Sequence, residues 1–123
     1  MSNEIKVTQS LSCSNVNLTY QSGNISFRAN QAGSLKTGNT QSIGTTATQV
    51  AFASSFSNPG WGEFTNLDST NYLQIGVEVS STFYPLVTLL PGETTLFRLA
   101  QLTNVYAQAN AAACLLDYTI LET

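Results

Sequence analysis

Apolar and polar residues alternate with a period of two along most of the chain. The clearest alternation is LQIGVEV at residues 73–79, and residues 83–89 repeat it. Because successive side chains of a strand point to opposite faces, this alternation predicts half-buried β-strands. The same alternation or similar apolar runs occur at residues 16–20, 25–27, 50–52, 96–99 and 114–121.

Short segments rich in glycine, proline or small polar residues separate these runs. Residues 80–81 and the Pro-Gly-containing residues 90–93 predict tight turns. Residues 67–71 predict a polar corner in which the side chains of Asp68 and Asn71 cap backbone amides. Pro85 lies inside an apolar run, and since proline cannot donate to a strand ladder, that strand is predicted to lie at an edge or to carry a bulge.

Two stretches have a weaker pattern. Residues 33–49 are rich in Thr, Gly, Ser and Gln, so they form either a long surface loop or the flat start of the strand at Val50. Residues 106–116 have the only helix-friendly composition, but strand patterns surround them. We interpret them as a strand end, then a loop or single helical turn, then the last strand.

About eight short strands and no long helix predict an all-β fold. We expect an antiparallel β-sandwich with jelly-roll topology, and an immunoglobulin-like sandwich is the alternative. The length of 123 residues suits one domain over residues 1–123, with residues 1–10 as a candidate extended arm.

The composition favours a neutral polar surface. Charged residues make up only 9% of the chain, whereas Ser, Thr, Asn and Gln together account for 49 of the 123 residues. Few charges must lose their hydration when such a surface meets a partner. The chain therefore suits packing against other protein.

Several classes of function are disfavoured. There is no histidine, and four basic residues against seven acidic ones give a net charge of −3. A histidine base and a basic nucleic-acid-binding face are thus missing, and no apolar run is long enough to cross a bilayer. Residues 1–10 lack the apolar core of a secretory signal. We expect no enzyme, no cofactor, no metal, no nucleic acid and no membrane.

The two cysteines, Cys13 and Cys114, lie near opposite ends of the chain. In a reducing compartment we expect two reduced, buried thiols. If the first and last strands are neighbours, a late disulfide stays open as an alternative. Two cysteines without histidine do not make a typical zinc site.

Large aromatic residues cluster around the predicted turns and edges. Trp61 lies between two glycines, which favours partial exposure, and Arg98 lies in an apolar strand, where it points outward or meets a carboxylate at a subunit contact. Sugar stacking on Trp61, Tyr72 and Tyr84 is the alternative use of such side chains. The candidate interface residues are Phe56, Trp61, Tyr72, Tyr84, Arg98 and Tyr106.

Four motifs and a closing strand follow one another along the second part of the chain. They are IGTT at residues 43–46, GWGEFTNLDSTNYLQIG at 60–76, LLPGETTLFRL at 89–99 and YAQA at 106–109, followed by a closing YTILE strand. This order resembles small β-rich virion proteins of tailed bacteriophages over about residues 43–122. The NLDSTNY string is the distinctive part, whereas the Pro-Gly-Glu turn is common.

The resemblance implies a structural part of a phage particle. A capsid cement, or decoration, protein is the expected kind: a small β-domain on the head surface that bridges capsomers as a dimer or trimer. Its partners are then the major capsid protein and copies of itself, and it is made in the host cytoplasm. A tail, baseplate or head–tail connector component and a carbohydrate-binding module are the alternatives.

Overall fold

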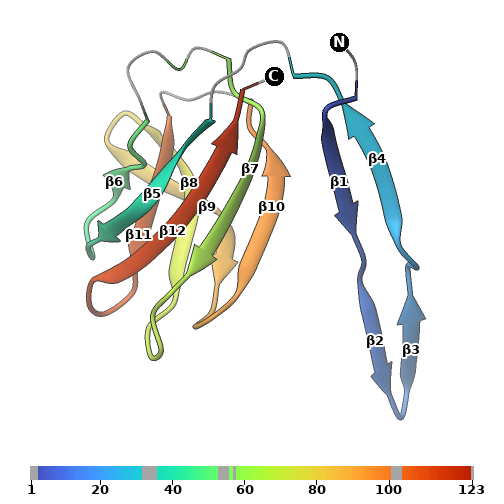
Figure 1. The fold of residues 1–123 in the computed structure, drawn as a ribbon. Coiled ribbons are helices and arrows are strands. Elements are labelled where there is room, and N and C mark those ends of the chain that lie inside the picture. Colours follow the sequence, from blue (N-terminus) through green and yellow to red (C-terminus); the bar gives the residue numbers. More distant parts are fainter. Residues whose placement is uncertain (1–2, 32–35, 53–55, 57, 101–103, 123) are drawn as a thin grey trace. The chain divides into compact units, whose positions relative to one another are not determined.

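The computed structural model of the chain describes residues 3–31, 36–52, 56, 58–100 and 104–122. The chain forms two compact units, Met1–Ala32 together with Thr123, and Gly33–Glu122. Throughout the described ranges the regular structure is β-strand (Figure 1). Every strand pairing is antiparallel. The predicted all-β antiparallel fold is therefore confirmed.

The first unit is a long two-stranded ribbon. In it, β1 pairs with β4, and β2 pairs with β3 beyond them. The backbone amide of Ser22 donates to the carbonyl of Leu11 at 2.9 Å and links the two halves. Val16, predicted to lie in a strand, occupies the turn at the tip instead. The strands are β1 (Ile5–Gln9), β2 (Ser12–Asn15), β3 (Leu18–Gln21) and β4 (Ile25–Ala29).

The second unit is a sandwich of two four-stranded sheets. One sheet has the order β10-β7-β12-β5 and the other the order β6-β11-β8-β9. The first strand of the unit thus pairs with the last, and the second with the last but one. The strands are β5 (Lys36–Ile43), β6 (Thr48–Gln49), β7 (Trp61–Asn66), β8 (Leu73–Val79), β9 (Thr82–Leu89), β10 (Thr94–Arg98), β11 (Val105–Ala109) and β12 (Cys114–Leu121).

The core of the sandwich lies between these sheets. In strand β12 buried side chains alternate with exposed or half-buried ones along its length, as in a half-buried strand. Phe64 on β7 is fully buried, and its ring stacks on Phe97 at 5.1 Å and on Tyr118 at 6.3 Å between centroids. The facing sheet contributes Leu73, Ile75, Val105, Ala107 and Ala109.

The predicted turns are confirmed, and so is the prediction that the strand containing Pro85 lies at an edge or carries a bulge. Residues 80–81 form the turn between β8 and β9, and Gly92 takes a φ of 79° in the turn before β10. Strand β9 is an edge strand, and its register with β8 shifts where Gly76 lies opposite Pro85. A Cβ at Gly76 would lie 2.0 Å from the Tyr84 carbonyl oxygen, so this bulge requires glycine.

Two weakly patterned stretches are resolved by the structure. The region of residues 33–49 contains β5, which pairs with β12 at the edge of its sheet, so it is not simply a surface loop. The strand predicted at Val50 ends earlier, because β6 stops at Gln49, although Val50 itself is fully buried. The interpretation of residues 106–116 is confirmed, since β11, a bend and β12 follow one another there.

The polar corner after β7 is organised by a buried asparagine. Asn66 Nδ2 donates to the carbonyls of Asn71 and Leu89 at 2.9 and 3.0 Å, and its Oδ1 accepts from the Asp68 amide at 2.9 Å. Asp68 in turn accepts from the amides of Thr70 and Asn71, as predicted, whereas Asn71 takes part through its backbone amide and carbonyl. These hydrogen bonds hold the pKa of Asp68 below its usual value.

Candidate interaction surfaces

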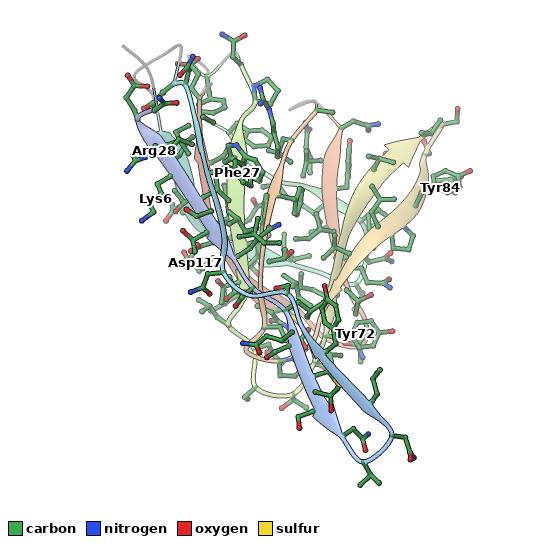
Figure 2. The ribbon with its side chains drawn as sticks, turned by 90° about the vertical axis from the view of Figure 1, so that its right-hand side faces the viewer. Lys6, Phe27, Arg28, Tyr72, Tyr84 and Asp117 are labelled. Carbon is green, nitrogen blue, oxygen red and sulfur yellow. The ribbon has the colours of Figure 1, made fainter. Side chains whose placement is uncertain are left out.

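The proximal half of the ribbon has two chemically different faces. Residues opposite each other in an antiparallel pair share a face. Val7 therefore shares one face with Phe27, whereas Lys6 shares the other with Arg28. Figure 2 shows the two cationic side chains on one side of the ribbon and Phe27 on the other. The ribbon is amphipathic here: one face is cationic, and on the apolar face Ile5 and Val7 are buried whereas Ile25 and Phe27 are exposed.

The distal half of the ribbon exposes apolar side chains as well. Leu18 and Tyr20 are two residues apart on β3, so they share a face, and Cys13 lies opposite Tyr20. All residues of β2 and β3 are exposed, and isolated hairpins are marginally stable in water. We therefore expect this face to be covered by a binding partner. The exposed large apolar residues of the ribbon are Leu11, Val16, Leu18, Tyr20, Ile25 and Phe27.

The two units carry net charges of opposite sign. Lys6 and Arg28 stand directly opposite each other, and Arg28 Nη1 donates to the Asn3 carbonyl at 3.1 Å. Among the described residues of the ribbon the single carboxylate, Glu4, accepts from the Gln31 amide and forms no ion pair with either cation. Counting formal charges, Lys6 and Arg28 against Glu4 give the ribbon unit +1. The sandwich unit carries −4, from two basic residues (Lys36, Arg98) against Glu63, Asp68, Glu78, Glu93, Asp117 and Glu122.

The sandwich has an apolar cavity between its two sheets. The cavity has a volume of about 270 Å³ and lies between the β8–β9 hairpin and β10. Leu86, the extra residue at the β9 bulge, lines it and is 75% exposed. The described residues of the lining include a single charged one, Arg98. Its apolar lining comes mainly from Ile75, Val77, Leu86, Val87, Phe97 and Leu99.

The chemically reactive groups are dispersed. Cys13 is exposed on the ribbon, which corrects the expectation of two buried thiols, whereas Cys114 is buried in the sandwich. Burial, together with the nearby negative charge of Asp68, raises the pKa of Cys114. Burial likewise raises the pKa of Tyr118, whose hydroxyl donates to the Ala51 carbonyl. Both groups are held in their neutral forms inside the sandwich.

Neither a metal site nor a membrane-spanning helix is present in the part of the chain that the structure describes. No three residues among the described His, Cys, Asp and Glu gather closely enough to hold a metal ion. No described helix is long and apolar enough to cross a membrane.

The residues that sequence reasoning marked for an interface lie in different places. Phe56 is buried in the core, and Tyr106 is half-buried on β11. Trp61 and Arg98 lie opposite each other in the β7–β10 pair, so these two are brought together. Tyr72 and Tyr84, both exposed, lie toward opposite ends of the sandwich (Figure 2). Trp61, Tyr72 and Tyr84 therefore form no common stacking platform.

Sequence reasoning marked Arg98, which lines the cavity, but not the ribbon face or the rest of the cavity lining. The ribbon was missed because alternation in residues 16–20 also fits a strand of the sandwich. Its detectable signal is residues 7–27, a stretch with no charged side chain in which apolar residues alternate. The cavity was missed because Leu86 follows Pro85 at a bulge, which reverses the inward and outward alternation there.

Comparisons with protein-family models, with curated proteins and with solved structures found no match to this chain.

Proposed function

We propose that this chain is a structural interaction protein of a bacteriophage particle, a capsid cement protein that bridges capsomers on the head surface. The carrying observation is the pairing of two unlike surfaces on one small chain: an amphipathic ribbon and a separate sandwich. A chain with two contact surfaces can join two neighbours, which is the task of a cement protein.

The strand order supports this proposal at the level of the fold. In a jelly roll, eight strands form two sheets in which the first strand pairs with the last and the second with the last but one. The sheets β10-β7-β12-β5 and β6-β11-β8-β9 fit this nested order. Jelly rolls are frequent in viral capsid and lectin domains. Because a fold hosts many functions, this support is an analogy, to which the resemblance of residues 43–122 adds.

The mechanism is the burial of area by many copies. Stable protein–protein contacts bury on the order of 1,000 Å² or more. With charged residues at only 9% of the chain, few ions need to be dehydrated at such contacts. Each copy then adds a modest free energy of binding, and the shell gains the sum over all copies.

The decisive experiment adds the purified protein to phage shells that lack it. We expect saturable binding and a rise of several degrees in the melting temperature of the shell, because a ligand of the folded assembly stabilises it by mass action. Since few contacts are ionic, binding should change little with salt. Absence of binding at every salt concentration would reject the proposal.

Copy number separates cement from the other stations in a virion. A cement protein occurs at a number comparable to that of the capsid subunits, whereas a connector or baseplate component occurs in few copies. Quantitative gel analysis of purified particles measures this ratio. A low copy number keeps the chain in the virion but moves it from the head surface to the tail, baseplate or head–tail junction.

A further inference from the structure

We propose that the ribbon of one copy inserts its distal apolar face, formed by Leu18 and Tyr20, into the cavity between the β8–β9 hairpin and β10 of a second copy. The inference rests on the proposed structural function and names one partner, a second copy of this chain. It assigns the cavity as the receiving site and the tip of the ribbon as the inserted element.

The two surfaces match in polarity. The apolar face of β3 carries two large exposed side chains and no charge, in a stretch that is uncharged from residue 7 to residue 27. The cavity lining is apolar apart from Arg98 and Asn104. Joining them removes apolar surface on both sides from water without stripping an ion from the ribbon. A charged ribbon tip would oppose this contact.

The two surfaces also match in size. A protein cavity of about 150 Å³ accommodates a benzene molecule. The cavity of about 270 Å³ therefore has room for the ring of Tyr20 together with the side chain of Leu18. Because the two residues are separated by one position on a strand, they project side by side from one face and enter together.

The charges favour this pairing over the symmetric ones. The ribbon unit carries +1 and the sandwich unit −4, so a ribbon attracts a sandwich, whereas two sandwiches repel each other. The contact is therefore heterologous, between unlike surfaces, and repeats from copy to copy as a ring or an open chain.

The test uses two full-length variants, each with one surface disabled. Leu18→Asp combined with Tyr20→Asp disables the ribbon, and Leu86→Asp disables the cavity. Both substitute exposed side chains, so circular dichroism should show the wild-type fold. Leu115→Asp, at an exposed leucine of β12 remote from both surfaces in sequence, is the matched control. Leu86→Lys repeats the cavity test with the opposite charge.

The readout is the mass in solution, from sedimentation equilibrium and native mass spectrometry. We expect the wild type and Leu115→Asp to associate with rising concentration, and each disabled variant to associate at least about 100-fold more weakly. An equimolar mixture of the two disabled variants should form dimers with one copy of each and nothing larger. Such dimers retain one intact ribbon–cavity contact.

Three results would overturn the inference. They are a wild type that stays monomeric at high concentration, disabled variants that associate like the wild type, and a mixture that stays monomeric. The last result rules out a contact between the ribbon of one copy and the cavity of another, because the mixture still supplies one intact ribbon and one intact cavity. The proposed function fails separately: a monomeric protein that still stabilises shells keeps that function and loses only the ribbon exchange.

Discussion

Both units of this chain have a pleated surface with an apolar face, and they differ in how far that face is buried. In the sandwich, two sheets turn their apolar faces toward each other, and Phe64, Leu73 and Ile120 have no exposed surface. In the ribbon, a single pair of strands leaves Leu18 and Tyr20 more than half exposed. Inward apolar residues stabilise the fold, whereas outward ones are available for association. Substitutions in the two units should therefore affect different properties.

The largest effect is expected from Phe64→Ala. The side chain is fully buried and stacks on Phe97 and Tyr118, so its removal leaves a cavity in the centre of the sandwich. We expect a loss of about 3–5 kcal/mol in the free energy of unfolding. Urea denaturation followed by the fluorescence of Trp61, the chain's single tryptophan, measures it within the sandwich unit.

Leu18→Ala on the ribbon is the comparison for this substitution. It removes about half as many apolar carbons as Phe64→Ala, from an exposed position, and we expect a change below about 0.5 kcal/mol in the unfolding of the sandwich. Equal losses from the two substitutions would show that the ribbon is part of the cooperative core, which contradicts the distinction between the units.

A smaller loss is expected from Asn66→Ala. The substitution removes three hydrogen bonds and leaves the carbonyls of Asn71 and Leu89 without their buried donor. A buried group left unsatisfied costs about 1–3 kcal/mol, so we expect a total of about 2–3 kcal/mol in the same denaturation experiment. Asn17→Ala at the exposed ribbon turn is the control, and a loss there as large as at Asn66 would refute the assignment.

Strands β8 and β12 could be predicted from the sequence because each has one face in the core, so that apolar residues recur at every second position. Pro85 was equally informative, because the missing amide restricts it to an edge or a bulge whatever the surroundings. Strand β5 could not be predicted with the same clarity. It lies at a sheet edge, and its short polar residues carry no alternation of hydrophobicity.

The surfaces were harder to predict than the strands, for a physical reason. The alternation in residues 16–20 has the same form whether a second sheet covers it or not, so it does not distinguish a ribbon from a sandwich strand. Asn66 was missed because its role depends on carbonyls at residues 71 and 89, which only the folded chain brings together. Phe56, chosen as an interface residue, lies in the core, where most large aromatics belong.

Thiol labelling compares the two units in the wild-type protein, because each unit contains one cysteine. Cys13 is exposed on the ribbon, and Cys114 is buried with its pKa raised by burial and by Asp68. Because the thiolate is the reactive form, a thiol reagent at neutral pH should label one cysteine quickly and the second only when the sandwich opens. We expect about a 100-fold difference in rate. Rising pH should speed the slow phase, since it ionises more of Cys114.

The same labelling experiment reports both the stability of the sandwich and the association between copies of the chain. Phe64→Ala should speed the slow phase at least about 100-fold, because it raises the population of the open sandwich, and it should leave the fast phase unchanged. The fast phase reports the ribbon, since Cys13 lies opposite Tyr20 on the face proposed to enter a second copy. Labelling of Cys13 should therefore slow as the wild-type concentration rises and stay constant in Leu86→Asp. A fast phase that responds to Phe64→Ala would show that the two units open together.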